Sequence, residues 1–201
     1  MKRIGLMALL FLALPLAAFA GNVDFTNNGG MLSGTAAGLT LTGSELTEVE
    51  GLGGPGLIQG ALGTVSFSTG SFISTVGKVS TFNGGGSFQI TGNGTGGIPN
   101  GIIFSGTFTG PVTLTLVSTQ PGGYDTYALS GSISGTWYNG QTVSGGTTQF
   151  YLFSAKNGWM GCSTFGSGNT IVTTVPEPGT LGLLGTGLMA LAGIVRRKPK
   201  A

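Results

Sequence analysis

Hydrophobic and polar residues alternate along much of the middle of the chain. The clearest case is residues 127–137, where most of the positions between the large apolar residues are Ser, Thr or Gly. The large apolar side chains of this run all fall on one face: Tyr127, Leu129, Ile133 and Trp137. Residues 112–116 and 39–42 repeat the pattern. A period of two is typical of a β-strand with one buried face and one wet face, so the pattern predicts half-buried strands.

Other runs contain the β-branched and aromatic residues that favour strands: 64–68, 71–76, 87–91, 102–108, 147–154 and 169–174. Turn-forming groups separate them, among them Asn93-Gly94 and Asn139-Gly140, because Asn and Gly reach positive φ at little cost. Pro111 cannot donate to a strand ladder, so we expect it at a turn or edge between residues 102–108 and 112–119, which would then be sequential neighbours.

Many short strands punctuated by turns predict an all-β domain, an antiparallel β-sandwich or barrel of about 8–12 strands. We expect no helix of ordinary length in residues 21–174. A parallel β-helix stays open because of the high glycine content, although no fixed period repeats along the chain.

The N-terminus has the three parts of a secretory signal peptide. Lys2 and Arg3 precede an apolar stretch at residues 4–16, and Ala18 and Ala20 form an A-x-A cleavage site before Gly21. Residues 1–20 are therefore predicted to form a signal helix that is removed on export.

The C-terminus also divides into three parts. A rigid, proline-containing hexapeptide comes first: Val175, Pro176, Glu177, Pro178, Gly179 and Thr180. An uncharged apolar run follows at residues 181–195, and the chain ends in a basic cluster: Arg196, Arg197, Lys198 and Lys200. This order predicts a transmembrane helix whose cations stay on the cytoplasmic side. The run covers roughly 23 Å at ~1.5 Å per residue, against a hydrocarbon core of ~30 Å, so flanking residues must help it span. A buried C-terminal helix is the alternative.

The hexapeptide, apolar run and basic end together resemble the PEP-CTERM sorting signal of exported bacterial proteins. The resemblance covers only about residues 175–201. It implies transient insertion in the inner membrane and processing by an exosortase, a membrane-embedded, cysteine transpeptidase-like enzyme. It also implies a place at the cell surface or in an exopolysaccharide or biofilm matrix.

Composition changes once the two ends are set aside. The whole chain has a formal charge of +2, but residues 21–174 contain only Lys78 and Lys156 as cations. Their five anions are Asp24, Glu45, Glu48, Glu50 and Asp125, which gives this body a formal charge of −3. The basic character of the whole chain is therefore no sign of nucleic-acid binding.

The sequence contains no His and one Cys, which excludes His-dependent serine triads and zinc sites of the Cys/His type. We predict no catalytic residue, no metal site and no cofactor. In an extended chain Glu48 and Glu50 share one face and Glu45 lies on the other, a poor arrangement for glycosidase carboxylates that must flank a bond. A solvated strand face is the preferred interpretation.

Aromatic residues within alternating strands are mostly expected in the core. Tyr138 and Tyr151 are out of phase with the apolar faces of their strands, so they are predicted to be exposed and are the candidates for sugar contact. The single thiol, Cys162, is predicted to be buried, with pairing between molecules as the alternative.

Three functions remain. The favoured hypothesis is a non-enzymatic, exported surface or extracellular-matrix protein sorted by its tail. The second is a carbohydrate-binding β-sandwich module that engages exopolysaccharide. The third is a carboxylate-based glycosidase.

Overall fold

The computed structural model describes residues 21–52, 56–154, 158–163 and 166–174, together with Gly187. Residues 22–174 form a compact unit. Within the described ranges the chain forms thirteen strands, with one 3-10 turn at Thr95–Gly97. The strands are β1 Gly21–Asn28, β2 Met31–Thr35, β3 Gly38–Glu50, β4 Leu57–Ser68, β5 Phe72–Val76, β6 Val79–Phe82, β7 Gly85–Asn93, β8 Asn100–Phe108, β9 Val112–Gln120, β10 Tyr124–Trp137, β11 Thr142–Ser154, β12 Gly161–Ser163 and β13 Gly166–Thr174.

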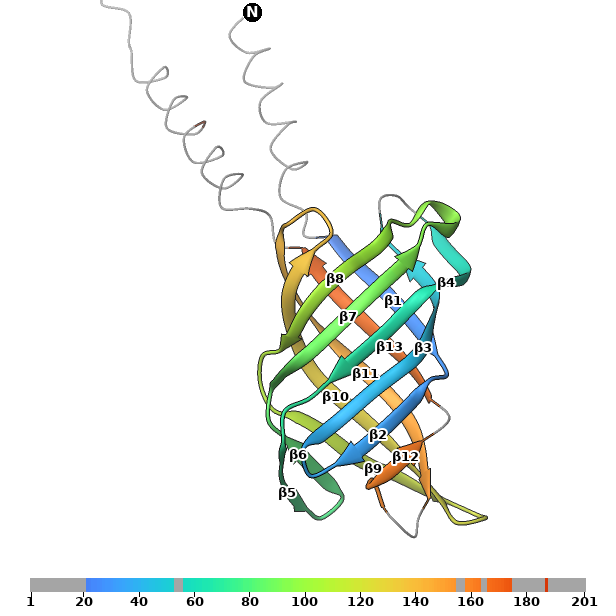
Figure 1. The fold of residues 1–201 in the computed structure, drawn as a ribbon, viewed down its shortest axis with the longest axis vertical. Helices are drawn as coiled ribbons and strands as arrows, with labels where there is room; N and C mark the ends of the chain where they lie inside the picture. The colour runs from blue at the N-terminus through green and yellow to red at the C-terminus, as the bar shows by residue number, and fades with distance from the viewer. Residues whose placement is uncertain (1–20, 53–55, 155–157, 164–165, 175–186, 188–201) are drawn as a thin grey trace, which may run out of the picture. The chain divides into compact units, whose positions relative to one another are not determined.

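Eight of these strands close into an antiparallel barrel. Their order is β11, β13, β1, β3, β4, β7, β8 and β10, and β10 pairs back onto β11 (Figure 1). Contacts at both ends align β13 with β1: the Thr173 hydroxyl donates to Asn22 Oδ1 at 2.9 Å, and the Gly29 N–H donates to Gly166 O at 2.7 Å. The all-β antiparallel prediction is confirmed, and the architecture is a barrel. The expected strand runs fall within observed strands, except that β5 begins at Phe72, one residue after the start of the expected run 71–76. Short strands such as β2 and β12 bring the total just above the predicted range.

Two long strands change partners along their length, and this adds further strands at one end of the barrel. Residues 45–50 of β3 pair with β1, whereas residues 38–42 pair with β2. Residues 133–137 of β10 pair with β8, whereas residues 124–130 pair with β9. In the sheet, β2 also pairs with β12. On the other side, β9 also pairs with β6, and β6 pairs with β5. Pro111 lies in the turn before β9 as predicted, and β8 and β9 follow one another along β10 instead of pairing.

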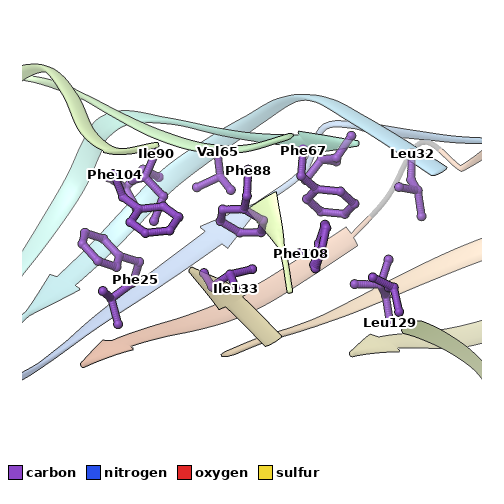
Figure 2. Close-up of a cluster of buried hydrophobic side chains, with 14 of the residues drawn as sticks. Phe25, Leu32, Val65, Phe67, Phe88, Ile90, Phe104, Phe108, Leu129 and Ile133 are labelled. Carbon is purple, nitrogen blue, oxygen red and sulfur yellow. The ribbon is translucent and has the colours of Figure 1, made fainter. Parts of the chain in front are cut away.

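Aromatic side chains fill the interior of the barrel. An eight-stranded barrel encloses a space just wide enough for side chains. Phe67 and Phe88 stack with ring centroids 5.6 Å apart, and Phe108 meets both edge-on at 5.7 Å (Figure 2). Such edge-to-face pairs add about 0.5–1.5 kcal/mol each beyond the area they bury. The apolar face predicted for residues 127–137 points into this core, since its four large side chains are all buried.

Small residues on one strand make room for large ones on the next. On the inner face, Gly166 of β13 lies opposite Tyr151 of β11, and Gly168 lies opposite Gln149. A side chain at Gly166 would overlap the Tyr151 ring, and one at Gly168 would overlap the Gln149 carboxamide. These glycines are therefore required by packing and do not mark turns.

Trp159 packs among the added strands. Its ring lies 5.1 Å from the ring of Phe72 on β5 and 4.9 Å from that of Phe82 on β6. Gly34 on β2 lies beneath it, where a side chain would overlap the Trp159 backbone carbonyl. Trp159 thus joins the part of the sheet that ends in β12 to the part that ends in β5.

The predicted signal helix at residues 1–20 lies outside the described residues. So does the predicted transmembrane helix at 181–195, apart from Gly187. In the described portion of the chain, no helix is long and apolar enough to cross a membrane.

Candidate functional site

The outer face of β10, β11 and β13 carries a shallow groove of about 800 Å³, called here the hydroxyl groove. Its floor is low because Gly146, which lies opposite the exposed Ser132 and Ile171, has no side chain. The other lining residues are Pro111, Ser130, Gly131, Ser132, Gly145, Thr147, Thr148, Asn169, Ile171 and Thr173. Among those whose side chains point outward, Ser130, Ser132, Thr148, Asn169 and Thr173 carry hydroxyl or carboxamide groups. Hydroxyls and carboxamides both donate and accept hydrogen bonds, so this surface suits a polar, neutral ligand.

A second groove of about 390 Å³, the aromatic groove, lies on β9, β10 and β11. Its lining residues are Gln120, Tyr124, Thr126, Phe150, Tyr151 and Leu152. Tyr124 and Phe150 are 55% and 44% exposed, which is high for large rings on a sheet. The Gln120 side-chain amide donates to Ser118 Oγ at 2.9 Å, which holds its carboxamide against the outer face of β9.

The two grooves lie end to end on one face of the sheet. In the β10–β11 register Ser130 is opposite Thr148, Ala128 is opposite Phe150 and Thr126 is opposite Leu152. Alternate residues of a strand point to the same face, so these rows follow one another on the outside of the barrel. None of the residues that line either groove is charged.

A buried polar network lies on the inner side of the same strands. Asn27 and Gln149 exchange two hydrogen bonds, with Asn27 Nδ2 to Gln149 Oε1 at 2.9 Å and Gln149 Nε2 to Asn27 Oδ1 at 3.0 Å. Asn27 Nδ2 also donates to Ser44 Oγ, and Gln149 Nε2 also donates to Thr147 Oγ1. The Thr147 hydroxyl lies 2.9 Å from that of Thr170. Because these groups bond to one another, we assign them the structural task of fixing the strands against each other.

Tyr151 belongs to this network, and the prediction that it is exposed is wrong. It is 1% exposed, and its hydroxyl donates to Gln149 Oε1 at 3.2 Å. Burial raises the pKa of the Tyr151 phenol well above its ordinary value. The buried face of β11 contains Gln149, Tyr151 and Phe153, which leaves Phe150 on the outside. Tyr151 therefore cannot stack against a sugar.

Tyr138, the other candidate for sugar contact, is 51% exposed, so its predicted exposure is confirmed. It follows the end of β10, and its ring lies tilted against Trp137 at 5.7 Å. It lines neither groove.

The glutamates of β3 all point outward, and the prediction that Glu45 lies on the face opposite Glu48 and Glu50 is wrong. In the β1–β3 register, Thr26 is opposite Glu48 and the next residue, Asn27, is opposite Leu46. Thr47 is therefore the extra residue of a β-bulge. The bulge shifts the alternation by one, so Leu46 and Val49 are both buried. Glu48 accepts a hydrogen bond from Gln59 Nε2 at 2.6 Å.

The other carboxylates do not assemble into a metal site. Asp24 lies opposite Glu50 on the outer face. Asp125 is buried, and its charge adds to burial in raising the pKa of Tyr127. Within the described residues there is no group of three or more His, Cys, Asp or Glu side chains that could hold a metal ion.

Cys162 is exposed on β12, so the prediction that it is buried is wrong. β12 pairs with β2 at an edge of the sheet, and Cys162 lies opposite Ser33 in the strand register. A run of only three residues, Gly161–Ser163, offers too little alternation for its faces to be read from sequence.

Sequence reasoning missed Phe150. It counted Tyr124 among the aromatic residues that could form a sugar-stacking platform but are mostly expected in the core. The sequence did hold a sign that Phe150 could face outward. Thr148, Phe150 and Leu152 alternate onto one face of the strand, whereas Gln149, Tyr151 and Phe153 alternate onto the other. Both parities contain apolar residues, so the choice of buried face depends on the partner strands.

The predicted sorting residues 175–180, the basic residues 196–200, Ala18 and Ala20 lie outside the described residues, and Gly21 begins β1. No curated protein and no solved structure matches the chain. Residues 174–198, however, match the PEP-CTERM protein-sorting motif. The motif implies export, sorting to the cell surface through the C-terminal tail, and processing by an exosortase. The chain is thus an all-β barrel protein that carries a PEP-CTERM sorting motif at its C-terminus.

Proposed function

We propose that this protein is a non-enzymatic component of the cell surface or extracellular matrix, an exported barrel delivered by its tail. The observation that carries the proposal is the sorting motif at residues 174–198. The signal-peptide pattern of residues 1–20 is consistent with the same route. In this proposal the tail inserts transiently in the inner membrane, and an exosortase then releases the barrel.

The chemistry of the barrel supports a role without catalysis. General acid–base and nucleophilic mechanisms most often use His, which the sequence lacks. The outward carboxylates Glu48 and Glu50 lie on one strand, whereas glycosidase carboxylates face each other across a bond. The aromatic and hydroxyl grooves contain no charged side chain.

Mass spectrometry of material secreted by the native host tests the proposal. We expect peptides from residues 21–174 and none from residues 181–201. Replacing Pro176 and Pro178 with Ala should leave the full-length chain in the membrane fraction. The matched control replaces Pro121, in the turn after β9, and should be processed normally. Finding only the full-length chain in membranes of the unmodified host would refute processing.

A second candidate function, binding of matrix polysaccharide, is favoured by one observation. The hydroxyl and aromatic grooves give the outer face an uncharged track with two exposed rings. Such a barrel would attach itself to the matrix into which it is released.

A further inference from the structure

We propose that the hydroxyl groove and the aromatic groove form one binding site for an extended, neutral polysaccharide, with Tyr124 and Phe150 as stacking platforms. The inference rests on the proposed export to a polysaccharide matrix. It adds the site, the contact residues and the charge of the polymer.

The two rings provide the apolar part of the site. Tyr124 lies at the start of β10, and Phe150 lies opposite Ala128, four residues further along that strand. The rings are therefore separated by roughly 14 Å along the sheet, at ~3.4 Å per residue. Thr126 and Leu152 lie between them. Sugar rings present flat C–H faces, and exposed aromatic rings bury these faces while leaving the hydroxyls at the rim.

Polar groups continue the track beyond Phe150. Ser130, Thr148 and Asn169 form an exposed row across β10, β11 and β13. Their hydroxyl and carboxamide groups match the mixed donors and acceptors of a sugar. The rows from Tyr124 to Ser132 extend over about 27 Å of strand, which favours a chain of sugars over a single unit.

The charge distribution selects a neutral polymer. No cation lines either groove, so the carboxylates or sulfates of an acidic polysaccharide would have no partner there. The outward carboxylates Asp24, Glu45, Glu48 and Glu50 all lie on β1 and β3 instead.

The sheet topology disfavours a peptide at this site. An extended peptide usually binds by adding a strand to a free sheet edge. β11 is paired with β10 and β13 on its two sides, and β10 is paired with β11 on one side and with β8 and β9 on the other. These strands offer side chains to a ligand and no free ladder.

Retention in polysaccharide-containing native gels tests the proposal. The full-length protein is used in a detergent without a sugar headgroup. The probes are three neutral polymers, hydroxyethylcellulose, glucomannan and dextran, and the acidic polymer alginate. We expect retention by at least one neutral polymer and weaker retention by alginate. Tyr124→Ala and Phe150→Ala should each raise the dissociation constant on the order of tenfold, as loss of an aromatic anchor typically does.

Two variants serve as controls. Tyr124→Phe keeps the ring and should retain binding. Tyr138→Ala removes an equally exposed tyrosine outside both grooves and should bind like the unmodified protein. Tyr124 and Phe150 lie on the outer face, so Tyr124→Ala and Phe150→Ala should unfold at the same temperature as Tyr138→Ala.

Retention by none of the three neutral polymers would overturn the proposal. Retention that Tyr124→Ala and Phe150→Ala leave unchanged would do so as well, and so would a preference for alginate. These outcomes are independent of the tail. Loss of glycan binding with normal processing refutes only the site, whereas an unprocessed chain that still binds glycan refutes only the sorting proposal.

Discussion

Gly168→Ala tests whether the buried amide network fixes the barrel. Gly168 lies on the inner face of β13, and a methyl group there would overlap the carboxamide of Gln149. A glutamine side chain could normally swing aside at small cost. Here four hydrogen bonds hold it, from Gln149 to Asn27 and Thr147 and from Asn27 and Tyr151 to Gln149.

The size of the effect follows from these bonds. A neutral hydrogen bond contributes a net ~0.5–1.5 kcal/mol, and a polar group left buried without a partner costs more. Displacing Gln149 breaks all four bonds in an interior with little room to form new ones. Overpacking strain of about 1–3 kcal/mol is the alternative if Gln149 stays in place. The loss of four bonds would cost ~2–6 kcal/mol, so we expect Gly168→Ala to lower the free energy of unfolding by about 2–3 kcal/mol, the range that the two routes share.

Urea unfolding of residues 21–174, followed by fluorescence of the buried Trp137 and Trp159, measures this loss. Gly146→Ala is the matched control, since it places a methyl on the outer face of β11, 3.7 Å from the nearest atom, Gly131 O. It should change stability by no more than ~0.5 kcal/mol. In a Gln149→Ala background, Gly168→Ala should cost less by about 1–3 kcal/mol, because the overlap is gone.

Equal effects of Gly168→Ala and Gly146→Ala would refute the reasoning. So would strictly additive losses in the double mutant, because additivity means that the two side chains do not compete for the same space.

Three further predictions concern single groups. Tyr151 has an ordinary pKa of 10.0 when unfolded and a raised pKa when folded, so unfolding releases a proton above pH 10 and stability falls there by up to ~1.4 kcal/mol per pH unit. Tyr151→Phe should make the pH dependence of urea unfolding above pH 10 shallower, and an unchanged slope would contradict the burial. Cys162 should react with a bulky maleimide in the folded protein, and labelling that requires denaturant would contradict its exposure. Glu50→Gln removes a like-charge pair with Asp24 and should stabilise the fold by a few tenths of a kcal/mol in low salt, an effect that 1 M salt should abolish.

Part of the fold could be predicted from sequence because some strands have one unambiguous apolar face. In residues 127–137 of β10 the large side chains alternate onto one face and the other face is mostly Ser and Thr, so the buried face was predicted correctly. β11 has apolar residues on both parities. Its buried face depends on Gln149 meeting Asn27, which is 122 residues away in the sequence. Strand-by-strand reading cannot supply that pairing.

The β3 bulge shows the same limit in another form. Alternation is a local rule, and one extra residue at Thr47 inverts it for the rest of the strand. The closing of the barrel was equally beyond local reading, because β3 and β10 each pair with two successive strands on one side. Both features depend on partners chosen by packing across the whole sheet.

The alternation of side chains on β11 made the binding site hard to predict from sequence, and it also makes the site testable. On β11, Gln149, Tyr151 and Phe153 hold the interior, while Thr148, Phe150 and Leu152 form the outer surface. Because neighbouring residues point to opposite faces, Tyr151→Phe should alter stability without changing the grooves, and Phe150→Ala should alter binding with little effect on the core. One strand therefore separates the two roles residue by residue. A binding loss that tracked inner-face substitutions would mean that the grooves are a consequence of the fold and have no ligand of their own.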